Sequence, residues 1–267
     1  MYTAPFRYLR AASLAEAEAL FAGTPDAKYI AGGQTLIPTM KQRLAAPAAL
    51  IDVSRIAALS FIRREKPMLV IGAGTPHADV AASSEVRAPL PGLATLAGLI
   101  GDPAVRHKGT LGGSVANNDP AADYPAAVLA LGATVKTTRR TIAADAFFTG
   151  MFQTALSDGE LIADIGFPIP LRAGYAKFPN PASRYALVGV FVAQFPDSVR
   201  VAVTGAAPCV FRVADMEQAL SRSFTPDAVA GVTVKPDGLN SDLFASAEYR
   251  AHLVTIMAKR AVAAALG

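Results

Sequence analysis

Two short stretches of the 267-residue chain decide how it folds and what it binds: AGGQT at residues 31–35 and TLGGS at residues 110–114. Each holds two adjacent glycines followed by a polar side chain. Adjacent glycines let the backbone turn tightly and approach a ligand closely, because no Cβ intervenes. Successive N–H groups in such turns point into one concavity and bind anions, typically phosphate oxygens. Two such loops in one domain therefore predict a clamp on a diphosphate, and so a dinucleotide ligand.

Either glycine pair taken alone also fits an ordinary tight turn. Neither matches the GxGxxG pattern of Rossmann domains or the GxxxxGK[ST] pattern of P-loop nucleoside triphosphatases. No motif therefore supports either of those two folds. What favours the dinucleotide is the recurrence of the pair together with nearby hydrogen-bonding groups, namely Gln34, Thr35, Thr110 and Ser114.

A dense polar segment, VANNDPAADYP, follows the second glycine pair at residues 115–125. Asp123 stands at the start of a predicted helix, where its carboxylate can accept hydrogen bonds from ribose or ribityl hydroxyls. The same pattern is typical of helix capping, since Asp is favoured at helix N-termini. Both interpretations of Asp119 and Asp123 stay open at this point.

Composition excludes several classes of protein. A hydrophobic content of 52% with only 17% charged residues excludes a disordered chain. The net charge of +4 is spread along the sequence, which argues against nucleic-acid binding. The lone Cys209 excludes an intramolecular disulfide, an iron–sulfur cluster held by this chain's own thiolates and a CxxC zinc site. The three histidines show no metal-binding spacing, so no metal site is predicted.

The first ten residues carry one proline, two arginines and three aromatic residues without an apolar core, so no signal peptide is predicted. No segment approaches 18 uninterrupted apolar residues, so no membrane span is predicted either. We expect a cytoplasmic protein.

Local patterns predict an α+β fold, because helices and strands alternate without a regular βαβ rhythm. A boundary is expected near residue 170, with a softer one near residue 56. A linker is expected over 169–182, and a polar loop over 101–119. The predicted helices cover 13–23, 90–100, 124–131 and 246–266, with another starting at Thr75–Pro76. The predicted strands cover 28–31, 50–53, 68–72, 133–138, 160–167, 188–194 and 199–204.

The sequence resembles a known family, the FAD-binding medium subunits of molybdenum hydroxylases. Carbon monoxide dehydrogenases and xanthine dehydrogenases are examples of these enzymes. The segments AGGQTLIP (31–38) and RHKGTLGGSVA (106–116) resemble the two FAD loops of that family. Further similar segments follow in order over nearly the whole chain: PFRY (5–8), SLAEA (13–17), IDV (51–53), IGAGT (71–75), DPAAD (119–123), KF (177–178) and ASRY (182–185).

The resemblance implies an oxidoreductase with a two-part FAD-binding domain of the vanillyl-alcohol oxidase type over residues 1–170, split near 56. A smaller C-terminal α+β domain would cover 171–267. It also implies two partners: a small subunit with [2Fe–2S] clusters and a large subunit with the molybdenum cofactor, assembled as a dimer of heterotrimers. This chain would pass electrons from the clusters through FAD to an external acceptor; NAD, quinone, cytochrome and dioxygen all fit.

The resemblance also implies cofactor-binding roles, with no catalytic base or nucleophile on this chain. Asp123 would hold the ribityl or adenosine-side hydroxyls, and Ile162 would pack on the adenine side. Lys177 would lie near the polar edge of the flavin ring, and Tyr185 beside that ring. The FAD contacts implied in the two loops are Ala31, Gly32, Gly33, Gln34, Thr35, Leu36, Thr110, Gly112, Gly113 and Ser114.

One position departs from the family pattern, which often has a histidine where Asn117 stands. Asparagine cannot titrate, so Asn117 keeps hydrogen bonding but no proton relay. Three alternatives are weaker: a self-sufficient FAD oxidoreductase, a flavin-free scaffold subunit, and a serine hydrolase using Ser114 and His252. The last needs a strand directly before the serine, whereas residues 103–108 are polar and charged.

Overall fold

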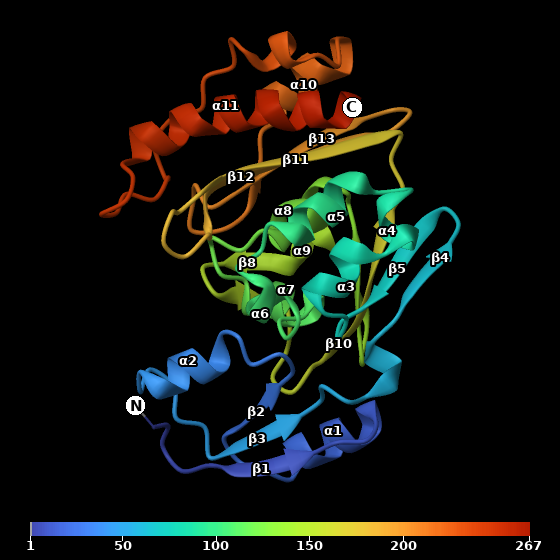
Figure 1. Ribbon diagram of the computed structural model, residues 1–267, viewed down its shortest axis with the longest axis vertical. Helices are drawn as coiled ribbons and strands as arrows, with labels where there is room; N and C mark the ends of the chain where they lie inside the picture. The colour runs from blue at the N-terminus through green and yellow to red at the C-terminus, as the bar shows by residue number, and fades with distance from the viewer. Residues whose placement is uncertain (1) are drawn as a thin grey trace.

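In the computed structural model, which describes residues 2–267, three parallel strands form the N-terminal layer (Figure 1). Their order is β1 (Arg7–Arg10), β3 (Ala49–Asp52), β2 (Ala27–Ile30). The connection from β1 to β2 is helix α1 (Leu14–Ala22), whose first turn is capped because the Ser13 hydroxyl accepts the Glu16 N–H. After β2, the chain turns through residues 31–35 into the short helix α2 (Leu36–Lys41).

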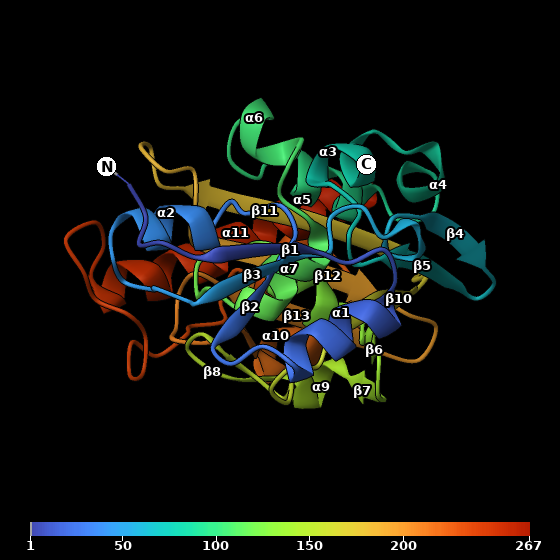
Figure 2. The same ribbon diagram turned by 90° about the horizontal axis from the view of Figure 1, so that it is seen from below.

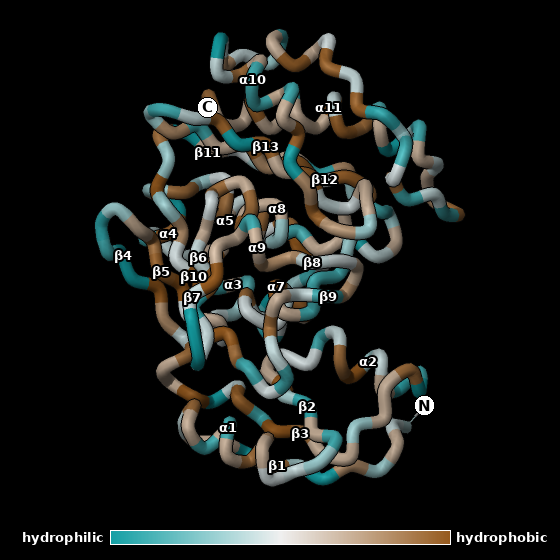
Figure 3. Tube along the Cα trace, turned by 180° about the vertical axis from the view of Figure 1, so that it is seen from behind, coloured by the Kyte–Doolittle hydropathy of each residue, from teal (hydrophilic) through white to brown (hydrophobic). Residues whose placement is uncertain are grey.

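A five-stranded antiparallel sheet forms the middle of the molecule, in the order β4 (Ile62–Glu65), β5 (Met68–Gly72), β10 (Ile162–Pro168), β6 (Thr134–Thr137), β7 (Thr141–Ala143). Its edge strand β4 is hydrophilic, whereas β5 and β10 are markedly more hydrophobic (Figure 3). The chain between β5 and β6 forms α3 (His77–Ala82), α4 (Ser84–Arg87), α5 (Pro91–Gly98), α6 (Pro103–Arg106), α7 (Leu111–Asn117) and α8 (Tyr124–Ala130). Helix α9 (Ala144–Phe147) and a small ribbon, β8 (Phe148–Gly150) with β9 (Gln153–Thr154), complete this part.

The C-terminal part is a four-stranded antiparallel sheet, β11 (Arg172–Pro179), β12 (Ala186–Gln194), β13 (Val199–Thr204) and β14 (Phe211–Arg212). Two helices, α10 (Ala214–Arg222) and α11 (Ala247–Leu266), lie on one face, and α5 and α8 lie on the other (Figure 1). Two 3-10 turns, Ala57–Leu59 and Pro226–Val229, are the remaining elements.

Strand β12 shows how this sheet joins the rest of the molecule. Val188, Val190 and Val192 pack in a core with α11, while Phe191 and Ala193 belong to the larger core built around the middle sheet. Alternate residues of a strand point to opposite faces, so this strand is buried on both sides. The helices between β5 and β6 are thus held between two sheets.

Most predicted elements are confirmed, but the linker predicted over 169–182 is wrong. Residues 172–179 form β11, which pairs with β12 along its whole length. Gly174 was interpreted as a sign of a linker, but it lies inside the strand because α11 packs closely against it. A Cβ on Gly174 would lie 2.1 Å from the Ala261 carbonyl oxygen of α11. Pro179 stands at the end of the strand, beside a register shift, where a missing N–H is tolerated.

The polar loop predicted over 101–119 is also wrong in part, since α6 and α7 lie within it. The second glycine pair belongs to the first turns of α7, with Thr110 as N-cap. Glycine is a poor helix former, so local propensity hid this helix. Among the four paired glycines only Gly33 has a left-handed backbone, with φ of +68°.

Candidate functional site

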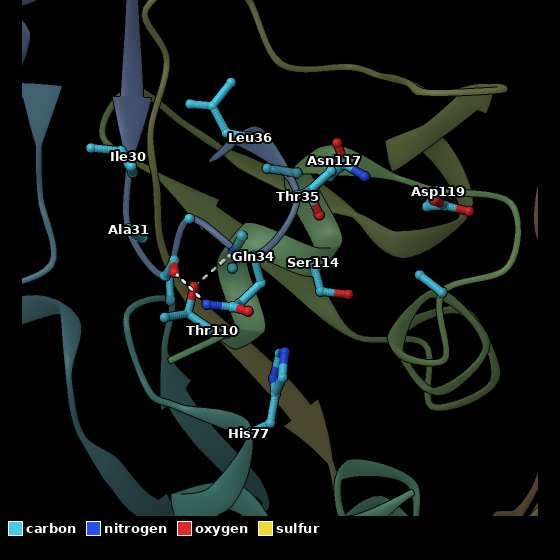
Figure 4. Close-up of a pocket in the computed structure, with 18 of the residues that line it drawn as sticks. Ile30, Ala31, Gln34, Thr35, Leu36, His77, Thr110, Ser114, Asn117 and Asp119 are labelled. Carbon is cyan, nitrogen blue, oxygen red and sulfur yellow. Dashed lines mark hydrogen bonds between the residues drawn. The ribbon is translucent and has the colours of Figure 1, made fainter. Parts of the chain in front are cut away.

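The β2–α2 turn and the start of α7 face each other across a cavity of about 620 Å³ (Figure 4). This volume falls within the range typical of cofactor pockets. Seen from below in Figure 2, the strands β1–β3 and helix α2 lie in front of α7. The walls come from residues near 28–36, 73–77, 109–123, 156–162 and 183–185. Of the fifteen predicted site residues, all except Lys177 line the cavity.

The first glycine loop offers an anion-binding surface. The backbone N–H groups of residues 32–35 donate to no acceptor among residues 2–267, and all four residues line the cavity. Gly33 reverses the chain here with its positive φ, and the Gln34 side-chain amide donates to the Gly32 carbonyl at 3.2 Å (Figure 4). Consecutive N–H groups left free by such a turn are the usual ligands of a phosphate group.

The second glycine pair works differently from the prediction. The Gly112 N–H donates to the Ala73 carbonyl at 2.7 Å, and the Gly113 N–H donates to the Thr110 hydroxyl at 3.1 Å. The Ser114 N–H donates to the Thr110 carbonyl. These amides are already used within the protein, so the structure has one amide pocket rather than two. This turn contributes two residues to the cavity lining, the solvent-exposed Gly113 and the half-buried Ser114.

Glycine is required in both stretches because backbones touch. A Cβ on Gly32 would lie 2.0 Å from the Lys108 carbonyl oxygen, and one on Gly112 would lie 2.4 Å from the Ala73 Cβ. No side chain fits at either position without moving the backbone. The close approach at Gly32 brings the first loop against the segment that leads into α7, and so places both stretches on one cavity.

Asp123 lies on the cavity wall as the resemblance implied, whereas Lys177 is outside the lining. Asp123 lines the cavity, but its carboxylate accepts hydrogen bonds from the Tyr175 hydroxyl and pairs with the Lys177 amine at 2.9 Å. Both side chains are almost fully buried, at 5% and 3% exposure. Asp123 makes no side-chain cap of α8 either. The two buried side chains thus form an ion pair beside the cavity.

Sequence reasoning missed His77, because a histidine in a first helical turn is typically exposed to solvent. It is 4% exposed, lines the cavity and stacks obliquely on Tyr124, with ring centroids 5.3 Å apart. Its Nδ1 has no hydrogen-bond partner among the described residues. Burial, reinforced by Arg106, lowers the pKa of His77 to about 4, so its imidazole is neutral at pH 7. The sequence feature that could have indicated His77 is its position shortly after strand β5, close to Gly72 and Gly74.

Burial of His77 makes the free energy of unfolding depend on pH. Its pKa is lower in the folded chain than the usual 6.5, so the unfolded chain binds more protons as pH falls. Between pH 6.5 and 4 the free energy of unfolding should drop by about 3 kcal/mol through this group alone. His77→Gln should flatten that slope in urea unfolding at pH 7 and pH 4.5. The exposed His107, changed to Gln, is the matched control, and an unchanged slope in His77→Gln would refute the assignment.

Comparison with known proteins agrees with this geometry. Residues 4–170 match the FAD binding domain in molybdopterin dehydrogenase. The chain belongs to this family. The family's cofactor in this subunit is FAD, and the cavity fits it: a pocket of sufficient size, free amides for a diphosphate and an apolar lining residue in Ile162.

The similarity extends beyond the matched domain. The nicotine 6-hydroxylase medium subunit of Paenarthrobacter nicotinovorans is 36% identical over 96% of this chain and 95% of its own. The carbon monoxide dehydrogenase medium chain of Hydrogenophaga pseudoflava is 36% identical over 97% and 96%. A solved structure of the latter enzyme, lacking the Mo-pyranopterin moiety, superposes with a TM-score of 0.88 over all of this chain and 99% of that one.

The family assignment confirms an oxidoreductase and removes the hydrolase alternative. Ser114 lies inside α7, the residues before it form α6 and a turn rather than a strand, and His252 is exposed on α11. Among residues 2–267, no His, Cys, Asp or Glu side chains gather as a metal site. No helix of the described chain has both the length and the apolar character needed to cross a membrane.

Proposed function

We propose that this chain is the FAD-carrying, electron-transferring medium subunit of a heterotrimeric molybdenum hydroxylase. Its partners would be a small subunit with [2Fe–2S] clusters and a large subunit with the molybdenum cofactor, arranged as a dimer of heterotrimers. The names of the relatives support this, because several are medium subunits or medium chains. The observation that carries the proposal is the run of four N–H groups at residues 32–35, which donate to no acceptor among the described residues and belong to residues that line the cavity.

The division into domains follows from the same proposal. Residues 1–170 would be the FAD-binding domain of the vanillyl-alcohol oxidase type, with parts at 1–56 and 57–170, and residues 171–267 the C-terminal α+β domain. The family match ends at residue 170, and the three-stranded and five-stranded sheets lie on either side of residue 56. The cavity lies between these two sheets, with the tip of the C-terminal sheet's β11–β12 turn at its rim.

Bound FAD would supply the redox chemistry, between a partner's cluster and an external acceptor. The chain's own residues bind and orient. The free amides of residues 32–35 would hold the diphosphate, and the hydroxyls of Thr35, Thr110 and Ser114 lie nearby to donate to it. Ile162, at 5% exposure, offers an apolar wall for the adenine. The neutral His77 adds no charge to this site.

Co-expression with candidate small and large subunits tests the proposal. Size exclusion should give one peak that contains flavin, iron and molybdenum together with this chain. A self-sufficient FAD oxidoreductase would instead purify alone, with FAD, and turn over a small substrate. Flavin in a peak that lacks iron and molybdenum, despite soluble partners, would contradict the subunit assignment but leave FAD binding intact.

A further inference from the structure

The buried amine of Lys177 joins three parts of the molecule. It lies in β11 of the C-terminal sheet, and its Nζ donates to the Leu99 carbonyl at 2.8 Å and to the Arg184 carbonyl at 2.9 Å. Its third partner is the Asp123 carboxylate, at 2.9 Å. An ammonium group has three donors. All three are thus used on protein oxygens, which leaves none for a ligand.

The Arg184 carbonyl belongs to a tight turn between β11 and β12. The Asn180 N–H donates to the Tyr185 carbonyl at 2.7 Å, and the Arg184 N–H donates to the Asn180 carbonyl at 2.9 Å. Arg184 itself has a left-handed backbone, with φ of +62°. The turn is therefore internally rigid, so a bond to Arg184 fixes the position of the residues beside it.

Tyr185 is the residue that this turn presents to the cavity. It lines the cavity with Ser183 and Arg184 and keeps 42% of its surface exposed. Burial of its hydroxyl raises the pKa of Tyr185, and the nearby Thr35 of the first glycine loop opposes the rise. Tyr185 thus comes from the C-terminal sheet and lines the same cavity as Thr35 of the first glycine loop.

We propose that Lys177 is a positioning residue for the flavin site: it holds the Arg184 carbonyl, and thereby sets the place of Tyr185 on the cavity wall, without contacting the cofactor. This replaces the role beside the flavin ring that the family resemblance implied. The inference rests on FAD as the occupant of the cavity and on no partner subunit.

A double-mutant cycle on the full chain loaded with FAD tests the inference. Lys177→Met removes all three bonds, so Tyr185 should leave its place on the cavity wall. An aromatic contact is typically worth a factor of about three to ten in affinity, so we expect FAD to bind roughly three- to tenfold more weakly. Flavin fluorescence should also rise, because a neighbouring tyrosine ring quenches it.

In a Tyr185→Ala background, the same Lys177→Met change should alter FAD affinity and fluorescence less than about twofold, since Lys177 acts through Tyr185. Lys177→Arg, which keeps a donor for the Arg184 carbonyl, should restore most of the quenching. Because Lys177→Met leaves Asp123 without its cation, Lys177→Met with Asp123→Asn is the second variant if the first fails to fold.

Two results would overturn the inference. Effects of Lys177→Met that are equal in the presence and absence of the Tyr185 ring would show that Lys177 acts on the flavin directly or only on overall folding. A shift of the flavin reduction potential by Lys177→Met in the Tyr185→Ala background would show a direct charge effect. A wild-type chain that binds no FAD would instead overturn the cofactor assignment itself, a separate and distinguishable failure.

Discussion

Gly32→Ala should deprive the chain of its FAD. The added Cβ would sit 2.0 Å from the Lys108 carbonyl oxygen and 2.7 Å from its carbon, both backbone atoms that cannot rotate away. The first loop must therefore move, and the free N–H groups of residues 32–35 move with it. We expect the dissociation constant for FAD to rise roughly a hundredfold or more, equivalent to about 3 kcal/mol.

Absorbance of flavin retained per chain after desalting, followed by titration of FAD into the apoprotein, measures this effect. Gly231→Ala is a matched control, because a Cβ there meets nothing within 4 Å. Gly113→Ala should lie between the two, since its Cβ would meet only the Thr110 hydroxyl, at 2.9 Å. Full flavin retention in Gly32→Ala, with the wild-type circular dichroism spectrum, would contradict the site.

Elements that depend on local patterns were predictable from the sequence. The Ser13 cap defines the start of α1, the apolar run at 68–72 is strand β5, and the turn at 195–198 joins β12 to β13. The cavity was predictable for a similar reason. The glycines and hydroxyls that a phosphate site needs are conspicuous in a chain with few other polar clusters, and nearly all of them line one cavity.

What the sequence did not reveal depends on contacts between distant segments. Nothing near Lys177 in the sequence indicates that Asp123 lies 2.9 Å away, and so that its charge is neutralised within the protein. Nothing near Gly112 indicates that its N–H is taken by the Ala73 carbonyl. His77 was missed for the same reason, since only tertiary packing buries it.

The largest loss of stability away from the cavity should come from Arg250 in the first turn of α11. Its guanidinium is 3% exposed and donates to the Leu187 carbonyl at 2.7 Å and the Gly205 carbonyl at 2.9 Å. It also pairs with Asp242 at 2.6 Å. These bonds tie α11 to the ends of two strands, and the Gly205 N–H in turn donates to the Pro120 carbonyl. Pro120 adjoins Asp119, so this chain of contacts reaches the cavity wall.

Arg250→Met keeps the length of the side chain but leaves the buried Leu187 and Gly205 carbonyls without this donor. Asp242 is half exposed and keeps its bonds from the Phe244 and Ala245 N–H groups. Each buried acceptor left without a donor costs about 1 to 3 kcal/mol, so we expect a loss of about 2 to 5 kcal/mol in the free energy of unfolding. Urea unfolding should show this as a lower midpoint with an unchanged slope. Arg260→Met, an exposed arginine on the same helix, should shift the midpoint little. Equal shifts in the two variants would mean that the helix needs only an aliphatic stem at residue 250, and that its hydrogen bonds contribute no net stability.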